Sequence, residues 1–346
     1  MTIKERKPRV VALGQPKYAG DDYLAEFSKE FDFSVLEAYN RTETMSLLPR
    51  SIKDDGPIDA FIIRMGTPPY EPFDQEMLGV LAETSPKCRI ITSASAGYNE
   101  FPVEWLADQG IWFTNTVDAV AEATADMALF LVLAVLRNTT NAEKSARGGT
   151  WRAMPGLVPA RDPTSLTLGI VGLGAIGKYL AKKAAVFNMK IKYYNRNRLP
   201  ADEEAKYGAE YCTLNELLGT SDIISLNCPL NASTTNLIGQ AEFAAMKDGC
   251  FVVNTARGGV IDEKAFKDAL QSGKVARAGL DVFCNEPNVD PWFLESDKII
   301  IQPHLGGLTD MAFQKAEREC FENIRQVFRY GKPRSPVIDI TKRGSQ

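Results

Sequence analysis

Residues 167–177 read TLGIVGLGAIG, an apolar segment followed by three glycines spaced as G-x-G-x-x-G. The apolar segment predicts a buried strand, and the residues after the glycines predict the start of a helix. Between such elements Gly172 allows a tight turn, Gly174 lets a phosphate approach the backbone, and Gly177 lets the helix pack closely on the strand. The stretch therefore predicts a Rossmann unit that binds a dinucleotide rather than a glycine-rich turn without function.

Short apolar segments alternate with helix-like segments on both sides of this stretch. The expected strands are residues 9–14, 34–38, 60–65, 89–94 and 111–114 in the first half of the chain, and 167–172, 190–194, 223–227, 251–254, 278–282 and 298–302 in the second half. Strands that alternate with helices form parallel βαβ units. The sequence predicts an α/β fold with two doubly wound parallel-sheet domains.

The domain organisation follows from two further segments. A long helix is expected over residues 117–150, and another over residues 311–330 that packs back on the first half of the chain. The first domain is then discontinuous, formed by residues 1–117 and 308–346. The Rossmann domain, residues 118–307, is inserted into it.

Composition limits the classes of partner. The chain has 346 residues, of which 45% are hydrophobic and 24% charged, and its net charge is −4. Such a composition is typical of a globular protein, and nucleic acid and anionic membranes are not expected partners. The apolar run at residues 127–136 is too short to span a bilayer. The first residues, MTIKERK, are charged, so no secretory signal is expected.

The six cysteines are scattered and form no Cys-x-x-Cys pair. With a single histidine in the chain, no metal site is expected. Reduced thiols are typical of a reducing compartment, so we expect a cytoplasmic location, although the sequence leaves the organelle open.

The turn after the strand at residues 190–194 reads NRNR, from Asn195 to Arg198. A carboxylate at this turn would bind the ribose diol of NAD and repel a 2′-phosphate. Asn195 does not repel a phosphate, and the guanidinium of Arg196 pairs with one. The turn predicts NADPH as the preferred cofactor and NADH as the alternative, unless it is only a solvated basic turn.

Three charged residues each follow a predicted strand of the second half: Arg257 in NTARG, Glu286 in LDVFCNEP, and His304 in QPHLGG. Because the carboxyl ends of parallel strands meet at one edge of a sheet, these side chains are expected to converge. They would supply a fixed cation, an acid to orient the histidine, and a proton carrier. Taken singly, each is more typical of an ordinary surface residue than of a catalytic one.

In this order, GLGAIG at 172–177, NTARG at 254–258, AGLDVFCNEP at 278–287 and QPHLGG at 302–307 resemble the D-isomer-specific 2-hydroxyacid dehydrogenase family. The resemblance covers essentially the whole chain. Residues 195–204 and 228–238 are most similar to the fungal NADPH-dependent glyoxylate/hydroxypyruvate reductase branch. Asn99 departs from the Asp that is common in the family's substrate loop, and Gln302 from the common Thr.

The resemblance implies a flavodoxin-like substrate domain and reduction of a small 2-oxo acid to the D-2-hydroxy acid. His304 would act as general acid, and Glu286 would orient its ring. Arg257 would bind the substrate carboxylate and polarise the carbonyl. The backbone amides of Ala96 and Gly97, in the loop ASAGY at 94–98, would hold the same carboxylate.

The resemblance also implies a set of cofactor-binding residues around the glycine loop. Besides Gly172, Gly174 and Gly177, they are Thr124, Ala175, Ile176, Asn195, Arg196, Asn197, Cys228, Pro229, Thr234, Thr255, Ala256, Arg257, Asp281, His304, Gly306 and Gly307.

Residues 119–163 match the family's dimerisation helix and arm, so a homodimer is expected. Trp151 in this arm would either reach the partner's substrate pocket or be an ordinary interface residue.

Two other functions stay open. The first is a reductase of bulkier branched or aromatic 2-oxo acids, similar to D-mandelate dehydrogenase, with pocket walls at residues 65–70 and Trp292. The second is a dinucleotide-sensing corepressor on the same scaffold, which a turnover assay would separate from an enzyme. A formate dehydrogenase is disfavoured, because that branch has Gln where this chain has Glu286.

Overall fold

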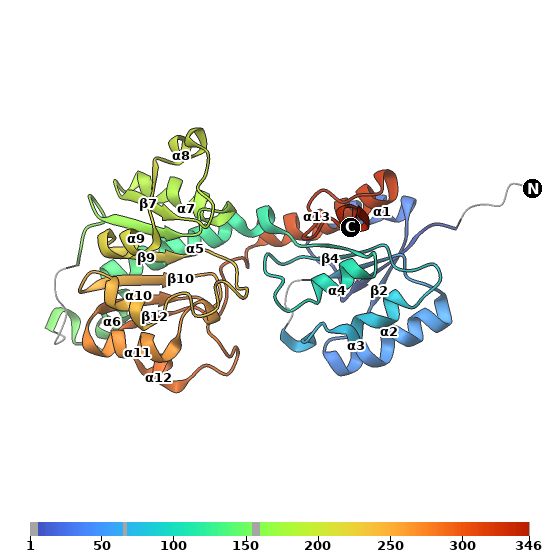
Figure 1. Ribbon diagram of the computed structural model, residues 1–346. Helices are drawn as coiled ribbons and strands as arrows, with labels where there is room; N and C mark the ends of the chain where they lie inside the picture. The colour runs from blue at the N-terminus through green and yellow to red at the C-terminus, as the bar shows by residue number, and fades with distance from the viewer. Residues whose placement is uncertain (1–5, 65–67, 154–159, 346) are drawn as a thin grey trace, which may run out of the picture. The chain divides into compact units, whose positions relative to one another are not determined.

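The computed structural model describes residues 6–64, 68–153 and 160–345 (Figure 1). The chain divides into two compact units. The first unit is Met1–Val120 with Leu308–Gln346, and the second unit is Ala121–Gly307.

The first unit contains a parallel five-stranded sheet in the order β2-β1-β3-β4-β5. Its strands are β1 (Arg9–Leu13), β2 (Asp32–Leu36), β3 (Ala60–Ile63), β4 (Ile90–Ser93) and β5 (Trp112–Thr114). Its α-helices are α1 (Asp21–Glu30), α2 (Arg41–Asp55), α3 (Gln75–Ala82), α4 (Val103–Asp108) and α13 (Asp310–Tyr330), with short 3-10 turns η1 (Pro68–Tyr70) and η4 (Ile340–Ser345). All five predicted strands are present, each ending one or two residues earlier than expected except β5.

Helix α13 lies beside α1 although most of the chain separates them in sequence (Figure 1). The ring of Phe321 packs edge-on against Phe27 at a centroid distance of 4.7 Å, and Phe313 stacks on Tyr18 at 4.6 Å. Thr309 caps the helix by accepting a hydrogen bond from the amide of Ala312. The predicted return of the C-terminal helix to the first half is confirmed.

The second unit contains a parallel seven-stranded sheet in the order β12-β11-β10-β9-β6-β7-β8. Its strands are β6 (Thr167–Val171), β7 (Lys190–Tyr194), β8 (Ala209–Tyr211), β9 (Ile223–Leu226), β10 (Cys250–Asn254), β11 (Val275–Leu280) and β12 (Ile299–Ile301). Strands β7 and β8 are added on one side of β6, and strands β9 to β12 are then added on its other side, so the order of the strands reverses at β6. Ligands of open α/β sheets bind at such a switch point. The predicted fold class is confirmed.

Helices cover both faces of this sheet. They are α7 (Ala175–Val186), α8 (Ala201–Tyr207), α9 (Leu214–Thr220), α10 (Gln240–Ala245), α11 (Glu263–Ser272) and α12 (Pro291–Glu295), with a 3-10 turn η3 (Gly258–Val260). On one face α9, α10 and α11 bury side chains such as Phe243 and Phe266 against Ile224 and Val252 of the strands. This packing fixes the strand ends that carry the site.

Two predictions about elements were wrong. Strand β8 was not predicted, because it has only three residues and pairs on one side alone, with β7. The single helix expected over residues 117–150 is two helices, α5 (Val117–Arg137) and α6 (Thr139–Arg147). Asn138 between them has a left-handed backbone, with φ 52° and ψ 47°, which ends α5. A 3-10 turn, η2 (Trp151–Ala153), follows.

By length and composition alone, the segment Asp118–Arg137 of α5 is apolar enough to cross a membrane, and it is longer than the predicted run at 127–136. However, 61% of its apolar window is buried inside the structure. Leu131 and Val135 belong to the core on the second face of the sheet, where Gly279 of β11 leaves room for them. We therefore interpret α5 as a core helix.

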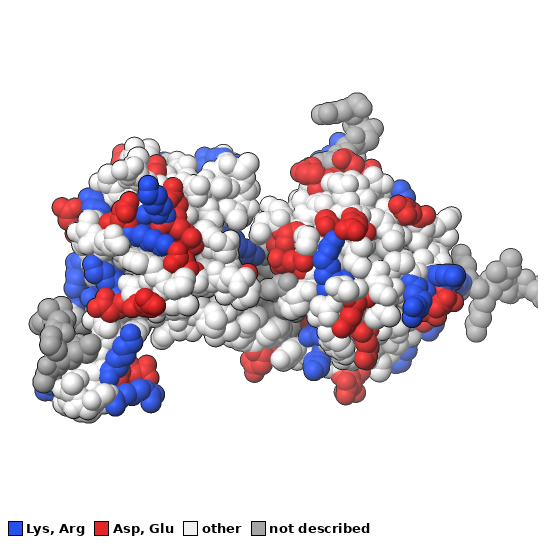
Figure 2. All heavy atoms as spheres, turned by 90° about the horizontal axis from the view of Figure 1, so that it is seen from below, with Lys and Arg blue, Asp and Glu red and all other residues white. Residues whose placement is uncertain are grey.

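Basic and acidic side chains are intermingled on the face shown in Figure 2. This distribution accords with the small net charge of −4. A small anion would have to be bound by a local basic group rather than by a broad basic surface.

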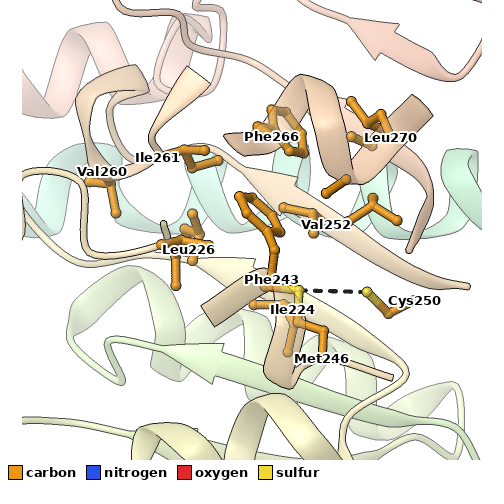
Figure 3. Packing of buried hydrophobic residues seen from close by; sticks show 14 of the residues in the cluster. Ile224, Leu226, Phe243, Met246, Cys250, Val252, Val260, Ile261, Phe266 and Leu270 are labelled. Atoms are coloured by element: carbon orange, nitrogen blue, oxygen red, sulfur yellow. Dashed lines mark hydrogen bonds between the residues drawn. The ribbon is translucent and has the colours of Figure 1, made fainter. Parts of the chain in front are cut away.

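The core under α10 and α11 is shown in Figure 3. Phe243 and Phe266 stack at a centroid distance of 5.5 Å, and the Cys250 thiol contacts the Met246 sulfur at 3.6 Å. Burial raises the pKa of the Cys250 thiol to about 11, so this cysteine is an apolar core residue and not a nucleophile.

Candidate active site

His304 and Glu286 form a hydrogen-bonded pair. His304 Nδ1 lies 2.7 Å from Glu286 Oε2, and Glu286 Oε1 accepts a hydrogen bond of 2.8 Å from the amide of Phe283. Burial by itself raises the pKa of Glu286, but the hydrogen bond and charge of His304, with Arg257 nearby, lower it overall. An ionised carboxylate therefore holds one ring nitrogen and leaves Nε2 outside this bond.

The backbone of His304 is held in the left-handed region, with φ 58°. For a residue other than glycine this conformation costs roughly 1–3 kcal/mol and needs support from its surroundings. Asp281 supplies that support: its carbonyl accepts from the His304 amide at 2.8 Å, and its carboxylate accepts from the amides of Leu305 at 2.7 Å and Gly306 at 2.8 Å.

Asp281 itself is 1% exposed. Burial raises its pKa, against the opposing effect of the two amide hydrogen bonds. The sequence resemblance placed Asp281 near the cofactor but did not indicate that it organises the histidine loop. The signal available in the sequence was an acid at the end of a buried strand, which needs such partners.

Arg257 follows β10 in a turn that Asn254 organises. The Asn254 side chain donates to the carbonyl of Arg257 and accepts from the amide of Ala256, both at 2.9 Å. A Cβ on Gly258 would overlap the carbonyl carbon of Phe283. The Arg257 turn therefore packs directly on the segment that precedes Glu286, so the ends of β10, β11 and β12 bring the three predicted catalytic residues together.

The glycine loop leaves room for an anion at the start of α7. Gly172 has φ 103°, and a Cβ on it would lie 2.8 Å from the amide nitrogen of Cys228. A Cβ on Gly177 would overlap the carbonyl oxygen of Gly172, whereas a Cβ on Gly174 would meet no atom within 4 Å. Gly174 caps α7 without a side-chain hydrogen bond, which leaves the first amides of the helix for a phosphate. Ala175 and Ile176 form the first turn of that helix.

Two polar side chains at this edge of the sheet are buried without a hydrogen-bond partner among the described residues: Asn227 Nδ2 and Thr255 Oγ1. Asn227 directly follows β9 and Thr255 follows β10. Buried polar groups are rarely left unpaired, so both fit a bound dinucleotide as their partner. Asn227 was not predicted, since nothing in its sequence neighbourhood marks it.

The other predicted cofactor residues lie around the same edge. Thr234 donates to the carbonyl of Pro229 at 2.6 Å, which holds the loop after Cys228. A Cβ on Gly306, next to Gly307, would lie 3.2 Å from a methyl group of Thr124.

The turn after β7 differs from its predicted role in one respect. Asn195 Oδ1 accepts a hydrogen bond of 2.7 Å from the amide of Leu173, so this side chain is tied to the glycine loop. Arg196 and Asn197 are exposed, and within the described ranges Arg196 makes no hydrogen bond or ion pair. Arg198, the second arginine of this turn, pairs with Glu204 at 2.8 Å.

In the first unit, Ala96 and Gly97 follow β4 as expected. Asn115 Nδ2 donates to the carbonyl of Ala96 at 2.6 Å, and Ser95 Oγ donates to the carbonyl of Gly97 at 3.0 Å. These bonds hold the carbonyl groups of Ala96 and Gly97, and so fix the conformation of the loop. Asn115 is 6% exposed and was not predicted.

Trp292 and residues 65–70 are the predicted walls of the substrate pocket. Trp292 in α12 packs edge-on against Phe293 at 5.3 Å and lies under the ammonium of Lys267. The other predicted wall is residues 65–70, of which residues 65–67 lie outside the described residues and Pro68–Tyr70 form η1. No group of three His, Cys, Asp or Glu among the described residues is arranged to hold a metal ion.

The NAD binding domain of the D-isomer specific 2-hydroxyacid dehydrogenases matches residues 129–306 of this chain. The chain belongs to this family. A dehydrogenase of Hormonema carpetanum named efuE is 56% identical over 337 residues, which are 97% of this chain and 83% of that relative. The family resemblance drawn from the motifs is confirmed.

Solved structures agree with this assignment. A glyoxylate reductase from Paecilomyes thermophila is 36% identical, with a TM-score of 0.87 over 96% of this chain and 98% of that one. The holo form of Rhodotorula graminis D-mandelate dehydrogenase is 32% identical, with a TM-score of 0.85 over 96% and 98%. The protein is therefore an NAD(P)-dependent oxidoreductase, a D-2-hydroxyacid dehydrogenase that uses a nicotinamide dinucleotide to reduce 2-oxo acids.

Proposed function

We propose that the protein reduces a small 2-oxo acid of the glyoxylate or hydroxypyruvate type to the D-2-hydroxy acid, with NADPH as the preferred cofactor. The observation that carries this proposal is the His304–Glu286 pair at 2.7 Å beside the Arg257 turn. The similarity to a glyoxylate reductase supports the substrate class.

His304 acts as the general acid in this proposal. Its Nδ1 is held by Glu286, whose negative charge favours the imidazolium, so Nε2 carries the proton that is given to the forming alkoxide. The guanidinium of Arg257 binds the substrate carboxylate and polarises the C2 carbonyl. The amides of Ala96 and Gly97 hold the same carboxylate. When bound, NADPH supplies the hydride.

The cofactor preference rests on Arg196 and Asn195. Arg196 is an exposed guanidinium without a partner among the described residues, at the turn where a 2′-phosphate is expected. Asn195 adds no negative charge there. Asn195→Asp combined with Arg196→Ala should weaken NADPH and improve NADH, reversing the ratio of their kcat/KM values by at least about tenfold.

Steady-state kinetics with both cofactors at low and high salt check this preference. Wild type should lose part of its preference for NADPH as salt rises, because an exposed charge pair is screened. A wild type that uses NADH as well as NADPH at low salt contradicts the proposal.

Substrate size is tested by NADPH oxidation against glyoxylate, hydroxypyruvate, phenylpyruvate and benzoylformate. We expect the highest kcat/KM with glyoxylate or hydroxypyruvate. A higher value with benzoylformate would favour the second candidate, a reductase of bulkier 2-oxo acids. The similarity to D-mandelate dehydrogenase over 96% of this chain favours that candidate.

We also propose a cytoplasmic homodimer that associates through residues 119–163. Phe130 and Trp151 in this region are 49% and 69% exposed, so both can contribute apolar surface to a partner subunit. The six free thiols suit a reducing compartment. Sedimentation equilibrium of wild type and of a Phe130→Glu variant checks the association, and an unchanged monomer mass in both would contradict it.

A further inference from the structure

A closed set of hydrogen bonds holds the turn that follows β7. The Tyr193 hydroxyl donates to Glu204 Oε1 at 2.6 Å and accepts from the amide of Leu199 at 3.0 Å. Arg198 donates through Nε to Glu204 Oε1 at 2.8 Å and through Nη2 to Oε2 at 2.9 Å. We call these four residues, Tyr193, Arg198, Leu199 and Glu204, the turn clamp.

The turn clamp is anchored in the interior of the second unit. Tyr193 is 0% exposed and Glu204 is 9% exposed. The guanidinium of Arg198 also lies over the ring of Tyr211, 5.4 Å from its centroid. A bidentate arginine–carboxylate pair has a fixed geometry, so the position of Arg198 is defined by Glu204.

Glu204 and Tyr193 each keep one protonation state at neutral pH. The hydrogen bonds from Arg198 and Tyr193 lower the pKa of Glu204 to about 2. Burial and the hydrogen bond to Glu204 raise the pKa of Tyr193 to about 12. The carboxylate therefore stays an acceptor and the hydroxyl stays a donor.

The start of the same turn, at Asn195, is also held by a hydrogen bond. Asn195 accepts from the amide of Leu173 in the glycine loop at 2.7 Å. Arg196 and Asn197 are thus the exposed residues between two fixed ends. Glu203, the neighbour of Glu204 in α8, pairs instead with Lys178 at 2.8 Å and Lys206 at 2.7 Å. In the described part of the chain its side chain makes no hydrogen bond or ion pair with residues 195–199, and it pairs only with these lysines of α7 and α8.

We propose that Glu204, acting through Arg198 and Tyr193, is the positioning residue that presents Arg196 to the 2′-phosphate of NADPH. This inference rests on the proposed NADPH preference. Because Glu204 also pairs with Arg198, Arg196 and not Arg198 binds the 2′-phosphate in this proposal. Ordering the turn before binding removes an entropic cost that would otherwise reduce affinity for the phosphorylated cofactor.

Dissociation constants for NADP⁺ and NAD⁺ test this role, measured on the full-length protein by quenching of tryptophan fluorescence. Glu204→Gln and Tyr193→Phe should each raise the Kd for NADP⁺ by roughly three- to tenfold and leave the Kd for NAD⁺ nearly unchanged. Glu203→Gln is the matched control, because it removes the adjacent charge in the same helical turn, and both constants should stay at wild-type values.

Two results would overturn the proposal. If Glu204→Gln tightened NADP⁺, Arg198 would be a phosphate ligand that Glu204 restrains. If both variants weakened NADP⁺ and NAD⁺ equally, the turn clamp would be a structural support without selectivity.

Hydrogen exchange at the Leu199 amide separates this inference from the cofactor preference. The amide should exchange faster in Tyr193→Phe than in wild type or Glu203→Gln, since its acceptor is removed. If wild type bound both cofactors equally, the NADPH proposal would fail, while faster exchange would still support the ordering of the turn. Unchanged exchange would overturn the turn clamp itself.

Discussion

At the residue scale, two carboxylates act on different parts of His304. Glu286 holds the ring through Nδ1, and Asp281 holds the backbone of the loop through its carbonyl and both carboxylate oxygens. The first bond fixes the orientation of the ring, and the others stabilise a left-handed backbone. The proton donor is thus defined in both ring orientation and backbone position.

The role of His304 as general acid predicts a large loss of rate on its replacement. His304→Gln should lower kcat roughly a hundredfold or more, with NADPH binding largely retained, because the glycine loop and the turn after β7 are unchanged. His304→Asn is a useful companion, since asparagine tolerates the left-handed backbone. Steady-state kinetics and fluorescence titration measure both effects. A rate near that of wild type in either variant would remove His304 from the mechanism.

Glu286→Gln should shift the pH dependence of reduction. The lowered pKa of Glu286 means that this group is ionised throughout the pH range of the reaction, so the variant loses a full negative charge beside the imidazole. The imidazolium is then less favoured, and the rate of reduction should begin to fall at a lower pH than in wild type. A pH–rate profile of kcat/KM measures the shift. Superimposable profiles would show that the pair has no role in catalysis.

At the scale of elements, the site depends on how closely the turn after β10 approaches the segment after β11. Gly258→Ala places a methyl group against the carbonyl carbon of Phe283, so one of the two segments must move. We expect a loss of roughly 1–3 kcal/mol of stability and a raised KM for the oxo acid, because Arg257 is displaced.

Gly259→Ala is the control for this prediction. Its new methyl group would meet only the side chain of Leu230, at 3.3 Å, which can shift. Thermal unfolding and substrate kinetics of the two variants should differ clearly. Equal behaviour would mean that the contact between the two segments does not position Arg257.

The sequence predicted elements and residues that leave a local signature. The glycine loop and the charged residues after buried strands were recognisable because each depends on residue type at one place in the chain. Strand β8 could not be predicted, since three residues carry no periodicity and pairing with β7 decides their conformation. The break at Asn138 was missed because asparagine is tolerated both inside a helix and at its end.

The parts of the site that were missed were specific contacts. The bonds from Asn115 to Ala96 and from the Gly306 amide to Asp281 join segments that only the fold brings together, and the bond from Arg198 to Glu204 depends on how the turn after β7 folds. Residue type alone showed that Arg198 carries a charge, but not that it forms an ion pair with Glu204.

At the scale of the whole molecule, each unit has its own core, and single core residues should act on one unit. Phe321→Ala removes a ring that is 0% exposed and packs on Phe27 and Phe33 in the first unit. Phe266→Ala is the matched change in the second unit, where the ring packs on Phe243 and Phe293. Each should cost roughly 3–5 kcal/mol of stability in its own unit.

Hydrogen exchange resolved by segment measures this separation. Phe321→Ala should accelerate exchange in the first unit and leave NADP⁺ binding by the second unit intact. Phe266→Ala should accelerate exchange in the second unit, weaken NADP⁺ binding, and leave exchange in the first unit unchanged. Equal loss of protection in both units would show that they unfold as one.

The position of α13 at the end of the chain has a consequence for biosynthesis. Phe27 is made early, but its partner Phe321 leaves the ribosome only after the 187 residues of the second unit have been translated. At about 5–20 residues per second, that interval lasts roughly 10–40 s. During this time Phe27 lacks its contact with Phe321, although its other ring partners, Phe31 and Phe33, are already present. The first unit therefore cannot complete its core until the second unit has been translated.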